Sequence, residues 1–177
     1  WLSHSFSWKP VIIALWLLSF GVVFVTISTL INSTILEYFG YLFSLIASFL
    51  YIYQIYIIYS TRVRIEKDIY LNSILISYSS LLISILLGIA YIFIKSDILL
   101  ITIGWVLFLG YVSFVIIGHL YKIVPFLVWF ERFSPLVGKQ KVPMLADIIP
   151  VKSAKMQFGF SAIGVFVSAL GILLSNN

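Results

Sequence analysis

Apolar residues fill five long stretches of the sequence, and short polar or charged segments separate them. A helix needs roughly 20 mostly apolar residues to cross the hydrocarbon core of a bilayer. The pattern therefore predicts an all-α, polytopic transmembrane helical bundle that forms a single membrane domain. Its five spanning helices are expected over residues 8–31, 36–60, 69–94, 98–121 and 155–174.

One long connection is predicted, over residues 122–153 between the fourth and fifth spans. It contains four prolines, which disfavour a continuous helix because proline lacks the backbone N–H and clashes with the preceding turn. Aromatic and charged side chains are mixed within it, a pattern typical of a broken amphipathic segment in the headgroup region. A plain solvated loop is the alternative. The expected interfacial anchors are Tyr121, Lys122, Pro125 and Trp129.

The composition supports a membrane location. Of 177 residues, 62% are hydrophobic and 10% are charged, whereas soluble domains average about 45–50% and about 25%. A chain this small cannot bury so much apolar surface inside itself, so lipid must solvate part of it. The absence of cysteine excludes disulfides, iron–sulfur clusters and thiolate metal sites within this sequence. Residues 1–10 have too few basic residues and no small-residue cleavage site for a signal peptide.

The basic residues indicate how the spans are oriented. With five spans, ten of the eleven Lys and Arg residues fall on one side of the membrane and only Lys95 on the other. Basic loops are retained in the cytoplasm. We therefore expect a bacterial inner-membrane protein with a cytoplasmic N-terminal segment and long loop, and residues 175–177 outside. The net charge of +5 then reflects topology, and no nucleic-acid partner is expected. The ten residues are Lys9, Arg62, Arg64, Lys67, Lys122, Arg132, Lys139, Lys141, Lys152 and Lys155.

Small residues line one face of several predicted helices. Helices in lipid associate through such faces, because small side chains let two backbones approach closely. The stripe in the third span consists of Ser73, Ser77, Ser80, Ser84 and Gly88, and that in the fifth span consists of Gly164, Ser168 and Gly171. We expect both to be packing faces. A path for an uncharged solute along the serine stripe is the alternative.

Few residues offer chemistry. Ionisable groups inside a membrane are usually functional, but here they fall near the predicted boundaries, which argues against an autonomous pump. His119 and His4 lie on the same predicted side, where they would be a candidate pair of haem ligands. The alternative is that His119 is an interfacial, hydrogen-bonded side chain and His4 a solvated one. Gln54 is expected to bond a neighbouring helix. No nucleophile–base pair, glycine-rich phosphate loop or set of metal ligands is found, so no catalytic residue is assigned.

One part of the chain resembles a known group of proteins. Between Gly104 and Pro150 it is similar to bacterial membrane proteins related to the haem-copper oxidase catalytic subunits and to NnrS-type haem proteins. The matching residues are Gly104, Trp105, Gly118, Leu120, Tyr121, Lys122, Ile123, Pro125, Phe126, Leu127, Trp129, Lys141, Val142 and Pro143. Those proteins often hold histidine ligands shortly before the Gly-Trp pair, where this sequence has residues 99–103, LLITI. The resemblance implies a related fold, and the first hypothesis below adds His119 as one haem ligand.

These features lead to three hypotheses. The first is a helical subunit, or C-terminal portion, of a haem-copper-oxidase-like protein in respiratory or nitrogen-oxide electron transfer, acting as a scaffold with haem as the possible cofactor. The second is a cofactor-free structural subunit that associates with other membrane subunits through the serine stripe. The third is part of a transporter for an uncharged solute.

Overall fold

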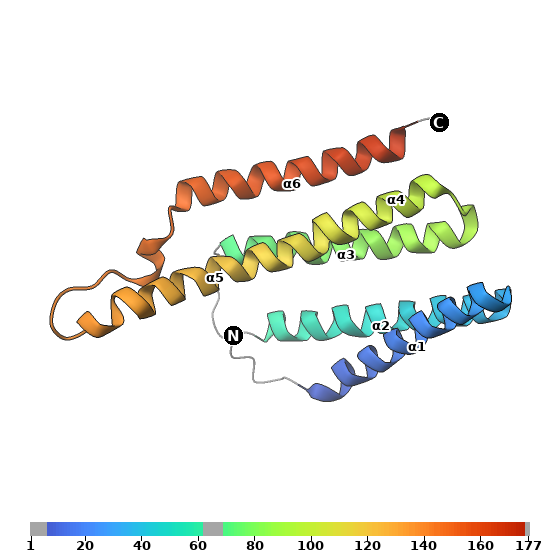
Figure 1. The fold of residues 1–177 in the computed structure, drawn as a ribbon, viewed down its shortest axis with the longest axis horizontal. Coiled ribbons are helices and arrows are strands. Elements are labelled where there is room, and N and C mark those ends of the chain that lie inside the picture. The colour runs from blue at the N-terminus through green and yellow to red at the C-terminus, as the bar shows by residue number, and fades with distance from the viewer. Residues whose placement is uncertain (1–6, 62–68, 176–177) are drawn as a thin grey trace. The chain divides into compact units, whose positions relative to one another are not determined.

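The computed structural model describes residues 7–61 and 69–175, and all regular structure in those two ranges is helical (Figure 1). Five helical segments in it are long and apolar enough to cross a membrane, which confirms the all-α, polytopic prediction. They are α1 (Trp8–Ile31), α2 (Thr34–Ser60), α3 (Ile69–Ile94), the continuous segment Asp97–Arg132, and α6 (Val151–Leu174). The chain divides into two compact units, Trp1–Glu66 and Lys67–Asn177.

The first unit is an antiparallel pair formed by α1 and α2. Glycines on the two helices let their backbones approach closely: a Cβ on Gly40 would lie 2.8 Å from the carbonyl oxygen of Gly21. The connecting turn is tight because Asn32 adopts a left-handed conformation with φ 53°, which asparagine tolerates better than most residues. At the other end of the pair, the buried Gln54 donates from Nε2 to the carbonyl oxygen of Ser7, at 3.3 Å.

The second unit pairs α3 with the long segment Asp97–Arg132 and adds α6. That segment consists of α4 (Asp97–Trp105), the π-helix η1 (Val106–Val112) and α5 (Ser113–Arg132). α6 packs against α4 and η1, and the indole Nε1–H of Trp105 donates to the carbonyl oxygen of Val165 on α6, at 3.3 Å. Further along, the rings of Phe114 and Phe158 meet edge to face.

The fourth spanning helix is longer than the sequence indicated. It continues through Pro125 and ends at Arg132, instead of at residue 121. A proline inside a membrane helix is tolerated where neighbouring structure compensates for the lost hydrogen bond, and the ring of Pro125 is buried. Pro135 follows three residues after the end of α5 and lacks the backbone N–H that would continue the α-helix. It lies instead in the first turn of a short 3₁₀ helix, Ser134–Leu136.

The connection to α6 is correspondingly shorter than the predicted 122–153. It covers residues 133–150 and contains two short 3₁₀ turns, η2 (Ser134–Leu136) and η3 (Leu145–Ile148). α6 begins at Val151, directly after Pro150, whereas the fifth span was expected from residue 155. Proline suits the beginning of a helix, because its missing N–H would have no partner there.

The two main helices of the second unit differ in length, which determines where the candidate site lies. At 1.5 Å per residue, the 36 residues of Asp97–Arg132 extend about 54 Å, and the 26 residues of α3 about 39 Å. Since the two are joined by a tight turn at Lys95, the excess lies at the opposite end. Figure 1 shows α5 continuing past the beginning of α3 and past the beginning of α6.

Candidate functional site

The serine stripe of α3 packs against the same chain. Ser73, Ser77 and Ser80 are fully buried, and Ser84 is 6% exposed. The hydroxyl of Ser77 donates to the carbonyl oxygen of Tyr111 at 2.9 Å. The stripe is therefore a packing face, as predicted. It is not the predicted contact with another subunit, and three of its hydroxyls are too deeply buried to line a solute path.

Two glycines on the long segment Asp97–Arg132 pack against this stripe. A Cβ on Gly110 would lie 2.7 Å from the Cβ of Ser80, and one on Gly118 would lie 3.1 Å from the Cβ of Ser73. Gly88, which the sequence placed in the same stripe, makes no such contact, because nothing lies within 4 Å of a Cβ built on it.

The π-helix explains how both glycines face α3. Gly110 and Gly118 are eight residues apart, and eight residues of α-helix turn through about 800°, which would leave the two about 80° out of line. A π-helical turn holds an additional residue and so reduces the rotation per residue. The hydroxyl of Ser113 donates to the carbonyl oxygen of Phe108, five residues earlier, at 3.0 Å. Nothing in the hydrophobic pattern distinguishes this turn, and the sequence analysis missed it.

The small-residue face of α6, unlike that of α3, is exposed. Gly164, Ser168 and Gly171 are all exposed, and nothing lies within 4 Å of a Cβ built on either glycine. Of the five spanning segments, α6 is the least buried. Among the described helices of the second unit, none covers this face.

His119 lies in a small cluster where α5 passes the beginning of α3. Its Nδ1 is 2.7 Å from the carbonyl oxygen of Val115, and because a carbonyl only accepts, the ring proton belongs on Nδ1. The ring of Tyr70 meets the imidazole edge to face, with centroids 5.4 Å apart. The ammonium of Lys122 lies 4.0 Å from the centroid of the same tyrosine ring. Nothing in the sequence distinguishes Tyr70, because its role arises only from contacts between two helices.

The structure describes one of the two predicted haem ligands, His119. The second predicted ligand, His4, lies outside the described residues. Across 7–61 and 69–175, no group of three or more His, Asp or Glu side chains is placed to hold a metal ion. His119 is also absent from the residues that line the cavity beside it. The described chain therefore provides one imidazole of defined orientation.

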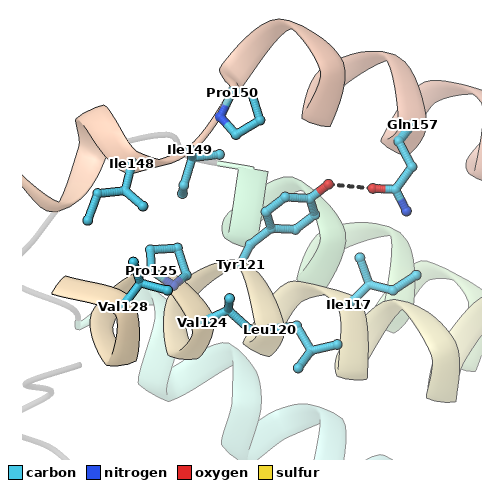
Figure 2. Close-up of a pocket in the computed structure, with 10 residues that line it drawn as sticks. All are labelled: Ile117, Leu120, Tyr121, Val124, Pro125, Val128, Ile148, Ile149, Pro150 and Gln157. Atoms are coloured by element: carbon cyan, nitrogen blue, oxygen red, sulfur yellow. Dashed lines mark hydrogen bonds between the residues drawn. The ribbon is translucent and has the colours of Figure 1, made fainter. Parts of the chain in front are cut away.

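That cavity lies between α5, η3 and the beginning of α6, and has a volume of about 340 Å³. Figure 2 shows the ring of Tyr121 reaching from α5 toward Gln157 on α6, with Ile148, Ile149 and Pro150 across from Pro125. The hydroxyl of Tyr121 donates to Oε1 of Gln157. The remaining lining residues are apolar: Ile117, Leu120, Val124, Pro125, Val128, Ile148, Ile149 and Pro150.

Each of the four predicted anchors has a defined contact. Tyr121 and Pro125 line the cavity, and Lys122 lies over the ring of Tyr70. The indole Nε1–H of Trp129 donates to the carbonyl oxygen of Pro143 at 2.9 Å, which ties the connection back onto α5. The predicted location of these residues in the headgroup layer stays a prediction.

A comparison of the chain with protein-family models, curated proteins and solved structures finds no match. The resemblance to haem-copper-oxidase-like proteins therefore stays a prediction from the residues that carry it.

Proposed function

We propose that this protein is a helical scaffold subunit, or portion, of a larger inner-membrane assembly of the haem-copper-oxidase-like class. The observation that carries the scaffold role is the exposed small-residue face of α6, formed by Gly164, Ser168 and Gly171. Electron transfer in respiration or nitrogen-oxide metabolism, as the setting of the assembly, is supported by the local resemblance alone.

The small-residue faces of the other helices are packed, in contrast to the exposed face of α6. The glycines of α1 and α2 pack against each other, and the serines of α3 pack against Gly110 and Gly118. Small residues add little to the solvation of a helix by lipid, whereas they permit close helix packing. The exposed face of α6 thus has the composition of the packed faces but no described helix of its own unit against it. Another subunit, or another part of the same protein, would cover it.

The test is the size of the assembly that contains the tagged chain after extraction from membranes in a mild detergent. We expect the wild type to elute in a complex larger than the tagged chain. The double substitution Gly164→Leu with Ser168→Leu should release the chain from that complex, because leucine prevents close helix approach. Leu170→Phe, also on the exposed surface of α6, is the matched control and should leave the complex intact. A wild type that is monomeric in every detergent, or a double variant that stays in the complex, contradicts the proposal.

Haem association through His119 is a second candidate. The hydrogen bond from Nδ1 to the carbonyl oxygen of Val115 favours it, since ligating histidines commonly donate their other ring N–H to a carbonyl, which orients the ring. We expect the haem to lie at an interface that a partner completes. A reduced-minus-oxidised absorption spectrum of the purified assembly tests this. We expect a haem signal that His119→Ala diminishes, and haem content unaffected by that substitution removes the ligand role.

A further inference from the structure

The cavity of the second unit lies toward the end of the unit at which the described part of α3 begins, and we expect this end at the depth of the lipid headgroups. Tyr70 is the second residue of α3, and it contacts both His119 and Lys122 on α5. Residue 122 therefore marks the level at which the described part of α3 begins. From there α5 continues to Arg132, a distance of about 15 Å. Val124, Pro125 and Val128, which line the cavity, lie within this overhang.

An apolar cavity at that depth requires an amphipathic occupant. Eight of its ten lining residues are apolar, and the exceptions are the hydrogen-bonded Tyr121 and Gln157. A volume of about 340 Å³ lies at the lower end of the range for small-ligand sites, about 300–1,000 Å³. Leaving such a surface against water and headgroups is unfavourable by about 25 cal/mol per Å² of apolar area. An acyl chain that enters from the adjacent bilayer would remove this cost.

The charge around the cavity selects among amphipathic molecules. Over residues 131–155, which include the end of α5, the connection and the first turn of α6, five cations face two carboxylates, a net charge of +3. All seven side chains are exposed. Asp147, one of the two acids, accepts a hydrogen bond from the backbone N–H of Met144 and so is engaged within η3. The cations are Arg132, Lys139, Lys141, Lys152 and Lys155.

We propose that this cavity is a binding site for an anionic phospholipid. The first part of one acyl chain occupies the space between α5, η3 and the beginning of α6. The phosphate lies among the cations of residues 131–155, with Arg132 one helical turn beyond the lining residue Val128. The Tyr121 hydroxyl and the Gln157 amide offer polar groups at the depth of the ester linkages. The lipid would hold the beginning of α6 against α5, where protein contacts are few.

Lipid retention by the purified protein tests the headgroup part of the proposal. The wild-type chain is equilibrated in detergent with equal amounts of phosphatidylglycerol and phosphatidylcholine that carry the same acyl chains, and bound lipid is measured by native mass spectrometry. We expect a preference for phosphatidylglycerol of at least about fivefold, the factor that one Lys or Arg contact near a membrane surface supplies. Equal retention of the two lipids, or retention of neither, overturns the proposal.

Two pairs of variants test the location. Val128→Trp fills the cavity from α5, whereas Leu127→Trp adds the same ring to an exposed neighbour that does not line it. Ile148→Trp and Leu145→Trp are the corresponding pair in η3. We expect each cavity variant to lose the retained phosphatidylglycerol and each control to keep it, at unchanged helix content by circular dichroism. Retention by folded cavity variants at the wild-type level overturns the site. If both cavity variants fail to fold, the preference of the wild-type protein for phosphatidylglycerol over phosphatidylcholine decides whether the proposal stands.

Discussion

The buried serines of α3 are chemically identical and yet have different roles. Ser77 donates across the helix pair to the carbonyl oxygen of Tyr111, whereas the hydroxyl of Ser73 is buried without a hydrogen-bond partner in the described structure. Ser80 and Ser84 bond back to carbonyl oxygens of α3 itself. For three of these four serines, then, the stripe contributes small size and close packing, and Ser77 alone adds a bond between helices.

This difference predicts opposite effects for two alanine substitutions. Ser77→Ala removes the bond to Tyr111 and should lower the free energy of unfolding by about 0.6 kcal/mol, the average for such bonds between membrane helices. Ser73→Ala removes a buried hydroxyl without a partner, so stability should be unchanged or higher. The measurement is unfolding by SDS titration in mixed micelles. A loss of stability in Ser73→Ala that matches or exceeds the loss in Ser77→Ala would contradict this account.

The stripe itself was predictable from the sequence, because the spacing of its serines repeats the turn of a helix and only a packed face needs small residues. The partner was not predictable. It depends on the register between α3 and the long segment, and that register depends on the π-helix around Gly110. Tyr70 was missed for the same reason, since its contacts with His119 and Lys122 come from a different helix.

At the scale of elements, apolar length identified the five spanning helices but located their ends only where the polarity changes sharply. The turn around Asn32 and the turn at Lys95 are short interruptions between long apolar runs, so the helix ends beside them agree with the prediction to within two residues. The end of α5 is different. Residues 122–132 are amphipathic, and Pro125 suggested that the helix would end there. The helix instead continues to Arg132, with the ring of Pro125 buried.

The overhang of α5 has a structural consequence that no single residue predicts. It carries the connection, η3 and the beginning of α6 beyond the level at which α3 begins. An amphipathic helix end surrounded by cations and by Trp129 is well suited to the headgroup layer. The candidate sites of the second unit therefore gather at one end: the cluster around His119 and the cavity behind Tyr121.

At the scale of the whole molecule, charge is distributed unevenly between the two ends of the second unit. The turn between α3 and α4 carries Lys95 and Asp97, whereas the opposite end carries the five cations of residues 131–155 and Lys122. The first unit has a corresponding turn between α1 and α2. If basic segments remain in the cytoplasm, both turns face outward. This fixes the direction in which each helix of each unit crosses the membrane, whatever the arrangement of the two units.

The lack of native cysteine in this sequence makes the topology directly measurable. Single cysteines are introduced at three exposed positions, Thr34→Cys, Asp97→Cys and Lys139→Cys, and intact cells are treated with a membrane-impermeant maleimide. We expect Thr34→Cys and Asp97→Cys to react at once, and Lys139→Cys to react only after the membrane is permeabilised. Reaction of Lys139→Cys in intact cells, with protection of the other two, would mean an inverted protein. The basic end of α5 would then face away from the cytoplasm, and an anionic lipid bound there would have to come from the outer leaflet. Reaction of Thr34→Cys and Asp97→Cys from opposite sides would instead mean that an odd number of spans separates the two turns, where the prediction places two, α2 and α3, and the predicted five-span topology would fail.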